Sequence, residues 1–198
     1  MLDTNGFWSE TYTGKKYYPT DPKNSDISIH DIAHALANNC RYNGHCKEFY
    51  SIAAHSVLVS RFVETVSDDP KTLLAALLHD ASEAYIHDII TPLKLQMPEY
   101  KELEAKWMEE IHKKFGIGEY DEELVKEADH AALKLEAYFL MGSHGVGWSF
   151  EETRFDDIVE YIKRNEPNTI DDLTGLGKNV LFRSRFSLLS HDIEYFGG

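Results

Sequence analysis

Apolar residues recur at spacings of three and four along most of the chain, which is the period of a helix with one buried face. The pattern predicts helices over 27–39, 48–66, 100–115, 121–141 and 155–162, with Ser28 as the N-cap of the first. A nearly continuous apolar run over 73–78 predicts a further, buried helix. Strand-like alternation is scarce, so we expect an all-α fold, a compact helical bundle.

Three segments depart from this pattern. Residues 1–26 are rich in aromatics and turn formers around Thr13-Gly14-Lys15, which predicts a short β-hairpin or an ordered arm. Residues 88–98 contain two prolines and are expected to form a loop, and 142–147 hold three glycines that end the helical pattern. We therefore expect an N-terminal aromatic arm over 1–26, a helical core over 27–141 and a helical extension over 142–198 packed on the same domain.

Histidines and carboxylates occupy positions where helices should be buried. His55 falls inside the helix 48–66, His79 and Asp80 follow the apolar run directly, and Asp129 lies inside the helix 121–141. Imidazole nitrogens and carboxylate oxygens suit a divalent ion, and three helices can present such ligands to one point inside a bundle. Zn, Mn, Co, Ni, Fe and Mg all remain open.

Glu83 follows the doublet closely enough to share its site. It lies four residues after His79 and three after Asp80, so one continuous helix would carry all three side chains on the same side. That arrangement would place an acid–base group beside a metal ion.

The charge balance bears on the class of ligand. The 198 residues include 20 Lys and Arg against 34 Asp and Glu, a formal net charge of -14 with neutral histidines. Such a charge opposes sequence-independent binding to a phosphate backbone, so we do not expect duplex nucleic acid as a partner. A small phosphate-bearing ligand remains compatible, because a few local cations and a metal ion can offset a screened repulsion.

The two cysteines, Cys40 and Cys46, are too few for a disulfide framework and are typical of reduced thiols in the cytosol. With His45 they are crowded and lack a second cysteine pair, so we assign them no metal. The first residues contain no basic and apolar leader, and the apolar run 73–78 is far shorter than the roughly 20 residues that cross a bilayer. We expect a cytoplasmic protein with no membrane segment.

The ordered set His55, His79-Asp80 and Asp129 resembles the H…HD…D signature of the histidine-aspartate (HD) domain phosphohydrolase superfamily. The stretches AHSVLVS, LLHDASEAYIHDI, the following TPLK, and EAD are similar to the branch that holds bacterial 5′-deoxynucleotidases and phage dATP triphosphohydrolases. The resemblance covers about 27–141. It implies that His55, His79, Asp80 and Asp129 are metal ligands, and that Glu83 and Asp88 have catalytic roles near the attacking water.

In that family an arginine followed by an aromatic residue lies upstream of the first ligand, and Arg41-Tyr42 is the match here, with tyrosine where the family more often has tryptophan. Arg41, with Lys47 or Lys94 as alternatives, can hold phosphate oxygens through charge-assisted hydrogen bonds. Tyr42 can stack on a base. We take these four residues as the candidate substrate-binding set.

The sequence thus predicts a divalent-metal-dependent phosphohydrolase of nucleotides, with a deoxynucleoside mono- or triphosphate as the small-molecule substrate. A phosphodiesterase or alarmone hydrolase of the same fold, and a noncatalytic sensor that binds metal and nucleotide, remain alternatives. Some HD proteins use additional histidines for a second metal, but we expect His112 to be solvated and His87 to lie in a turn. The family also allows a homo-oligomer, although no surface patch in the sequence identifies an interface.

Overall fold

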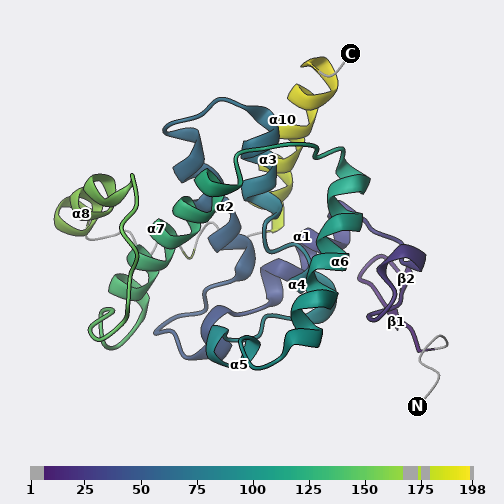
Figure 1. The fold of residues 1–198 in the computed structure, drawn as a ribbon, viewed down its shortest axis with the longest axis horizontal. Coiled ribbons are helices and arrows are strands. Elements are labelled where there is room, and N and C mark those ends of the chain that lie inside the picture. Colours follow the sequence, from purple (N-terminus) through teal and green to yellow (C-terminus); the bar gives the residue numbers. More distant parts are fainter. Residues whose placement is uncertain (1–6, 167–173, 175–178, 197–198) are drawn as a thin grey trace.

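The computed structural model describes residues 7–166, 174 and 179–196. Over these residues the fold is helical apart from one two-stranded antiparallel hairpin, in which β1 (Ser9–Glu10) pairs with β2 (Lys16–Tyr17) (Figure 1). The prediction of an all-α domain with a short N-terminal hairpin is therefore confirmed. None of the helices in the described ranges is long and apolar enough to span a bilayer.

Helix α2 (Ile52–Glu64) lies at the centre of the bundle (Figure 1). It packs against α3 (Pro70–Leu78), α7 (Glu122–Leu140), α1 (Ile29–Asn38) and α10 (Asn179–Phe196). Its first two turns carry the small side chains Ala53 and Ala54, which are fully buried and let neighbouring helices approach closely. Any polar side chain in this part of α2 is consequently surrounded by other helices.

Helix caps follow the sequence closely. The Ser28 side chain accepts a hydrogen bond from the His30 amide at the start of α1, as predicted, and the Asp121 side chain accepts one from the Leu124 amide at the start of α7. Asp69 does the same for the Thr72 amide in α3, at 2.9 Å. Each cap satisfies an amide that has no partner within its helix.

The helix that carries His79 differs from the prediction. Instead of continuing to Glu83, α3 ends at Leu78, and α4 (Glu83–Ile86) starts separately. Between them the backbone closes tighter turns, with the Ala81 amide bonded to the Leu78 carbonyl at 2.9 Å and the Glu83 amide to the Asp80 carbonyl at 3.1 Å. Such three-residue turns bring side chains three positions apart onto one side, so Asp80 and Glu83 still share a face.

The segment 88–98, predicted as a loop, contains the short helix α5 (Thr91–Lys94) and the first residue of α6 (Pro98–Phe115). Both prolines lie in the first turn of a helix, where the missing amide hydrogen would have no helical partner and the fixed φ suits the helix. Proline here begins helices rather than preventing them.

The N-terminal arm is tied to the core through α6. The buried Trp107 donates from its indole Nε1 to the Pro19 carbonyl at 2.9 Å, and its ring stacks on Tyr85 with centroids 4.2 Å apart. At the other end of the chain, α8 (Asp156–Asn165) packs on α7, and α10 packs on α3, α1 and α2. The predicted extension over 142–198 includes 167–173, 175–178 and 197–198, which lie outside the described residues.

Candidate metal centre

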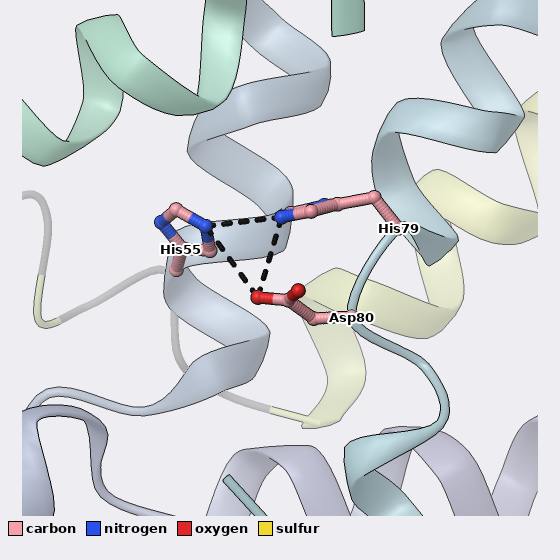
Figure 2. A group of neighbouring side chains, drawn as sticks. All are labelled: His55, His79 and Asp80. Carbon is pink, nitrogen blue, oxygen red and sulfur yellow. Dashed lines mark hydrogen bonds and ion pairs between the residues drawn. The ribbon is translucent and has the colours of Figure 1, made fainter. Parts of the chain in front are cut away.

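Three side chains, one from α2 and two from the residues that follow α3, point toward one another (Figure 2). His55, in the first turn of α2, is fully buried, while His79 and Asp80 follow the end of α3. The two Nε2 atoms lie 3.1 Å apart, and Asp80 Oδ2 lies 3.3 Å from the His79 nitrogen and 3.6 Å from the His55 nitrogen. The three residues form a group that could hold a metal ion.

The other ring nitrogens of the two histidines are already engaged. His79 Nδ1 lies 2.8 Å from the Ala76 carbonyl, which can only accept, so this nitrogen carries the proton. His55 Nδ1 lies 2.7 Å from a carboxylate oxygen of Glu136. If both rings are neutral, the lone pairs of the two Nε2 atoms point at the same place. Two lone pairs so placed repel each other, so a cation is required between them. The donor set therefore fits a divalent metal ion.

Asp129, on α7, approaches the same point from a third helix. Its Oδ1 lies 2.9 Å from His55 Nε2 and 3.9 Å from His79 Nε2. Burial alone would raise the pKa of Asp129, but its hydrogen bond to His55 and the charges of the two histidines lower it to about 2. Burial likewise works against Asp80, yet His79, His55 and Arg41 hold its pKa well below the usual range.

The surroundings of His55 favour a positive charge at this point. Burial and the Arg41 charge lower the pKa of His55, but Glu136 and Asp129 outweigh both and raise it to about 10. The environment thus stabilises a cation at Nε2, either a proton or a metal ion in its place.

Arg41 and Tyr42 lie beside this cluster, in the short turn η3 (Arg41–Gly44). The Arg41 guanidinium lies between two carboxylates, with Nη1 3.3 Å from Asp80 Oδ2 and Nε 3.3 Å from Glu136 Oε2. Tyr42 and Asn43 both have left-handed backbone angles, with φ of 56° and 52°. Two such residues in succession are strained, and the hydrogen bond from the Tyr42 hydroxyl to Glu136 helps to hold the turn in this form.

Glu83 is buried beside the cluster. Its Oε1 lies 3.5 Å from the Lys94 ammonium, whereas its Oε2 has no hydrogen-bond partner within the described part of the chain. Burial raises the pKa of Glu83 well above its ordinary value, and the nearby charges of Asp80 and Asp88 raise it further against the opposing effect of Lys94. Without a bound ion, these surroundings favour the neutral form of the Glu83 carboxyl group.

A cavity of about 640 Å³ opens in front of these residues. Its charged lining consists of Arg41, Asp80, Glu83, Asp88, Lys94 and Asp129. Apolar side chains, among them Ile89, Leu133 and Met141, complete the wall together with the rings of Tyr42 and Trp148. The cavity therefore joins a polar floor to an apolar and aromatic rim, a combination suited to a ligand with a charged end and a flat, less polar end.

The structure does not place every predicted residue in this cavity. Lys47 is outside the lining, where its amide donates to the Leu140 carbonyl at 2.8 Å and its ammonium to the Phe139 carbonyl at 3.4 Å. Carbonyls at the end of a helix lack partners within it and attract cations, which accounts for this position at the end of α7.

Two further histidines and the cysteines lie away from the centre. His112 is half-buried with its ring edge-on to Tyr120, 5.5 Å between centroids, rather than solvated as predicted. His87 is exposed and has a left-handed φ of 72°. Cys40 and Cys46 are free thiols with their sulfur atoms 3.7 Å apart.

Sequence reasoning missed two residues of the site, Glu136 and Trp148. Glu136 lies seven residues after Asp129 on α7, which is two helical turns, so the two carboxylates share a face of that helix. A charged residue among the apolar residues of the buried face of α7 is unusual, and this position could have identified Glu136 as a candidate. Trp148 lies in the glycine-containing segment after α7, and no local pattern connects it to the cavity.

A helical bundle that brings His55, His79 and Asp80 together as a group that could hold a metal ion, with Asp129 beside them, is of the metal-binding class. The chain belongs to the HD domain family, whose match covers residues 43–140. HD domains bind divalent metal ions and are generally metal-dependent hydrolases. The family match begins after Arg41-Tyr42 and ends before Met141 and Trp148, so four residues of the cavity lie outside it.

Two relatives extend the comparison beyond the matched domain. The uncharacterized protein YfdR of Escherichia coli (strain K12) is 40% identical over 181 residues, which cover 91% of this chain and 94% of that protein. An uncharacterized protein of Rhodobacter capsulatus is 35% identical over 144 residues, which cover 68% of this chain and 74% of that protein. The similarity to YfdR therefore extends over nearly the whole chain.

Proposed function

We propose that the protein is a divalent-metal-dependent phosphohydrolase that acts on nucleotides, with deoxynucleoside mono- or triphosphates as substrates. The observation that carries this proposal is the cavity itself, in which Arg41 and Lys94 line the same wall as Asp80 and Asp129, the two carboxylates of the cluster around His55 and His79. Cations beside a metal-binding cluster are suited to a phosphate group, and the aromatic rim is suited to a base.

In this proposal His55, His79, Asp80 and Asp129 hold the metal ion. When bound, a divalent ion lowers the pKa of a water molecule and polarises a phosphoryl group. Arg41 binds the phosphate oxygens, because its guanidinium reaches the cavity and its counter-ions Asp80 and Glu136 hold it in place. Its position orients the phosphorus atom toward the cluster.

Glu83 supplies the acid–base group. A carboxyl group with a raised pKa can donate a proton to the departing oxygen of a phosphate ester. This proton transfer is needed because an alkoxide is a poor leaving group. Lys94, 3.5 Å from Glu83 and 2.7 Å from Glu104, keeps the carboxyl group oriented and adds positive charge to the floor. Asp88 lines the same cavity and can accept a proton from a water molecule there.

Tyr42 and Trp148 form the base-binding rim. Their ring centroids are 6.0 Å apart with planes inclined by 54°, so a planar base can stack on one ring and rest its edge against the other. Trp148 lies outside the family match, so a preference among bases or sugars that depends on this ring would be set by this chain's own sequence.

The test is a screen of chelator-treated protein against each divalent metal ion and all ribo- and deoxynucleoside mono- and triphosphates, with chromatography of the products. Release of inorganic phosphate or triphosphate from deoxynucleotides supports the proposal and identifies the bond. Opening of a cyclic nucleotide or release of pyrophosphate from an alarmone would replace it with one of the other HD activities. Metal and nucleotide binding without turnover would indicate a sensor.

A matched variant guards against a contaminating phosphatase. Glu83→Gln keeps the size of the side chain and removes the acid, so it should lose turnover while retaining bound metal. Activity that is equal in both preparations would belong to a contaminant rather than to this cavity.

A further inference from the structure

Glu136 is a completely buried carboxylate that the proposed reaction does not use. Four side chains converge on it. Oε1 accepts hydrogen bonds from the Tyr50 hydroxyl at 3.0 Å and from His55 Nδ1 at 2.7 Å. Oε2 accepts one from the Tyr42 hydroxyl at 2.5 Å and lies 3.3 Å from Arg41 Nε.

Packing gives no reason for a charge at this position. The neighbouring buried positions of α7 carry Ala132, Leu135 and Leu140, and an apolar side chain would fill the space without the cost of burying an anion. Three of the four groups around Glu136, those of Arg41, Tyr42 and Tyr50, hold the carboxylate itself in one orientation. The fourth is the ring of a residue in the metal cluster.

We propose that Glu136 is a positioning residue for the metal centre: its carboxylate fixes His55 as the tautomer with a proton on Nδ1 and directs Nε2 toward the ion. This rests on the metal centre proposed above. A carboxylate behind a histidine ligand fixes the ring and makes the ligating nitrogen more basic.

His79 differs from His55 in this respect. Its Nδ1 faces the neutral Ala76 carbonyl, which belongs to its own helix and is present whatever the neighbouring side chains are. His55 takes its orientation from a side chain 81 positions away in the sequence. A substitution at 136 should therefore disturb one imidazole ligand and leave the other in place.

The first test measures metal binding by calorimetry on the chelator-treated full chain, with Co²⁺ and Mn²⁺ as probes. Glu136→Gln should raise the dissociation constant of both ions by about 10- to 100-fold. Asp31→Asn is the matched control, because Asp31 is also a buried carboxylate, accepting from the Thr13 amide at 2.8 Å and its hydroxyl at 2.9 Å. The control should keep the dissociation constant of the unaltered protein.

A second measurement determines the tautomer of His55 in the unaltered protein. In ¹⁵N-histidine NMR of the unaltered protein loaded with Zn²⁺, His55 should show a protonated Nδ1 and a metal-shifted Nε2, with His55→Asn used only to assign the signal. A metal-shifted Nδ1 would overturn the proposal, as would unchanged affinity in folded Glu136→Gln. Neither readout involves turnover, so a protein that hydrolyses no nucleotide still gives a decisive answer.

Discussion

Arg41 Nη1 lies 3.3 Å from Asp80 Oδ2, so the residue proposed to bind phosphate has a proposed metal ligand as its counter-ion. Both side chains are largely withdrawn from solvent, with 14% and 22% of their side-chain surface exposed. The pairing connects the two halves of the proposed site. Asp80 contributes negative charge to the metal cluster and also holds the guanidinium that should contact the substrate.

Replacement of Arg41 should therefore weaken substrate binding more than metal binding. A hydrogen bond to a charged group contributes about 1.5–3 kcal/mol, so Arg41→Ala should lower kcat/KM by about 10- to 150-fold, mainly through KM. Arg41→Lys keeps the charge but loses the planar fork, and should recover only part of the loss. Steady-state kinetics with metal content measured on the same samples checks this, and an unchanged KM would remove Arg41 from the phosphate site.

The ligand set can be tested by comparing two aspartates of one cavity. Asp80→Asn should weaken metal binding by at least about tenfold, because an amide oxygen does not replace an anionic ligand between two imidazoles. Asp88→Asn is the control, since Asp88 lines the cavity but is outside the clustered group. It should keep its metal and lose turnover. Elemental analysis after dialysis distinguishes the two, and full metal content in Asp80→Asn would contradict the ligand assignment.

Whether the sequence predicts a residue of this metal centre depends on how far along the chain its contacts lie. Local sequence patterns made it possible to recognise four residues, and the structure brings them to one point: His55, His79, Asp80 and Asp129. The place of Glu136 on the buried face of its helix marks it only as unusual, because its partners Tyr42, Tyr50 and His55 lie 94, 86 and 81 positions away in the sequence. Only the folded bundle reveals that contact.

Local hydrogen bonding limited the prediction elsewhere. The break between α3 and α4 could not be predicted from apolar spacing, because three-residue and four-residue turns bury nearly the same face. Lys47 was one of two alternatives to Arg41 at the phosphate, but its ammonium donates to the Phe139 carbonyl near the end of α7 instead. A positive charge near an active-site segment does not by itself indicate where the side chain points.

The acid–base role of Glu83 predicts a large loss of turnover and a pH shift. Glu83→Gln should lower kcat by about 10²- to 10⁴-fold with metal content unchanged. Lys94→Met should move the alkaline limb of the pH–rate profile to higher pH, because the Lys94 charge lowers the pKa of Glu83 against the effects of burial, Asp80 and Asp88. The profile of kcat/KM is the appropriate measurement. If the alkaline limb stays in place or moves to lower pH, it reports the titration of a group other than Glu83.

Trp148 should determine how tightly the base is bound. Stacking on an aromatic ring is worth about 1–3 kcal/mol per base, so Trp148→Ala should raise KM by about 5- to 150-fold with little change in kcat. Val146→Ala is the control, since Val146 belongs to the same segment, is 80% exposed and is not among the residues that line the cavity. Equal KM values for the two variants across all bases would show that the rim does not bind the base.

The cap of α3 makes a prediction about stability. The Asp69 carboxylate accepts hydrogen bonds from the Thr72 amide at 2.9 Å and from the Thr72 hydroxyl at 2.5 Å. Burial favours the neutral form and is the largest single effect, but these bonds together outweigh it and lower the pKa of Asp69 below its ordinary value. Asp69→Ala should therefore cost about 0.5–2 kcal/mol of unfolding free energy at neutral pH, and Asp69→Asn less, because asparagine also caps helices.

The sign of the pH dependence follows from that lowered pKa. A carboxyl group whose folded pKa lies below its unfolded value of about 3.9 stabilises the fold fully above that value, and loses the contribution as the pH falls through the folded pKa. Urea unfolding between about pH 7 and pH 3 should show the difference between Asp69→Ala and the unaltered protein shrinking toward acid. A difference that stays constant would mean that the hydroxyl of Thr72 and the packing of α3, rather than the charged cap, account for the loss.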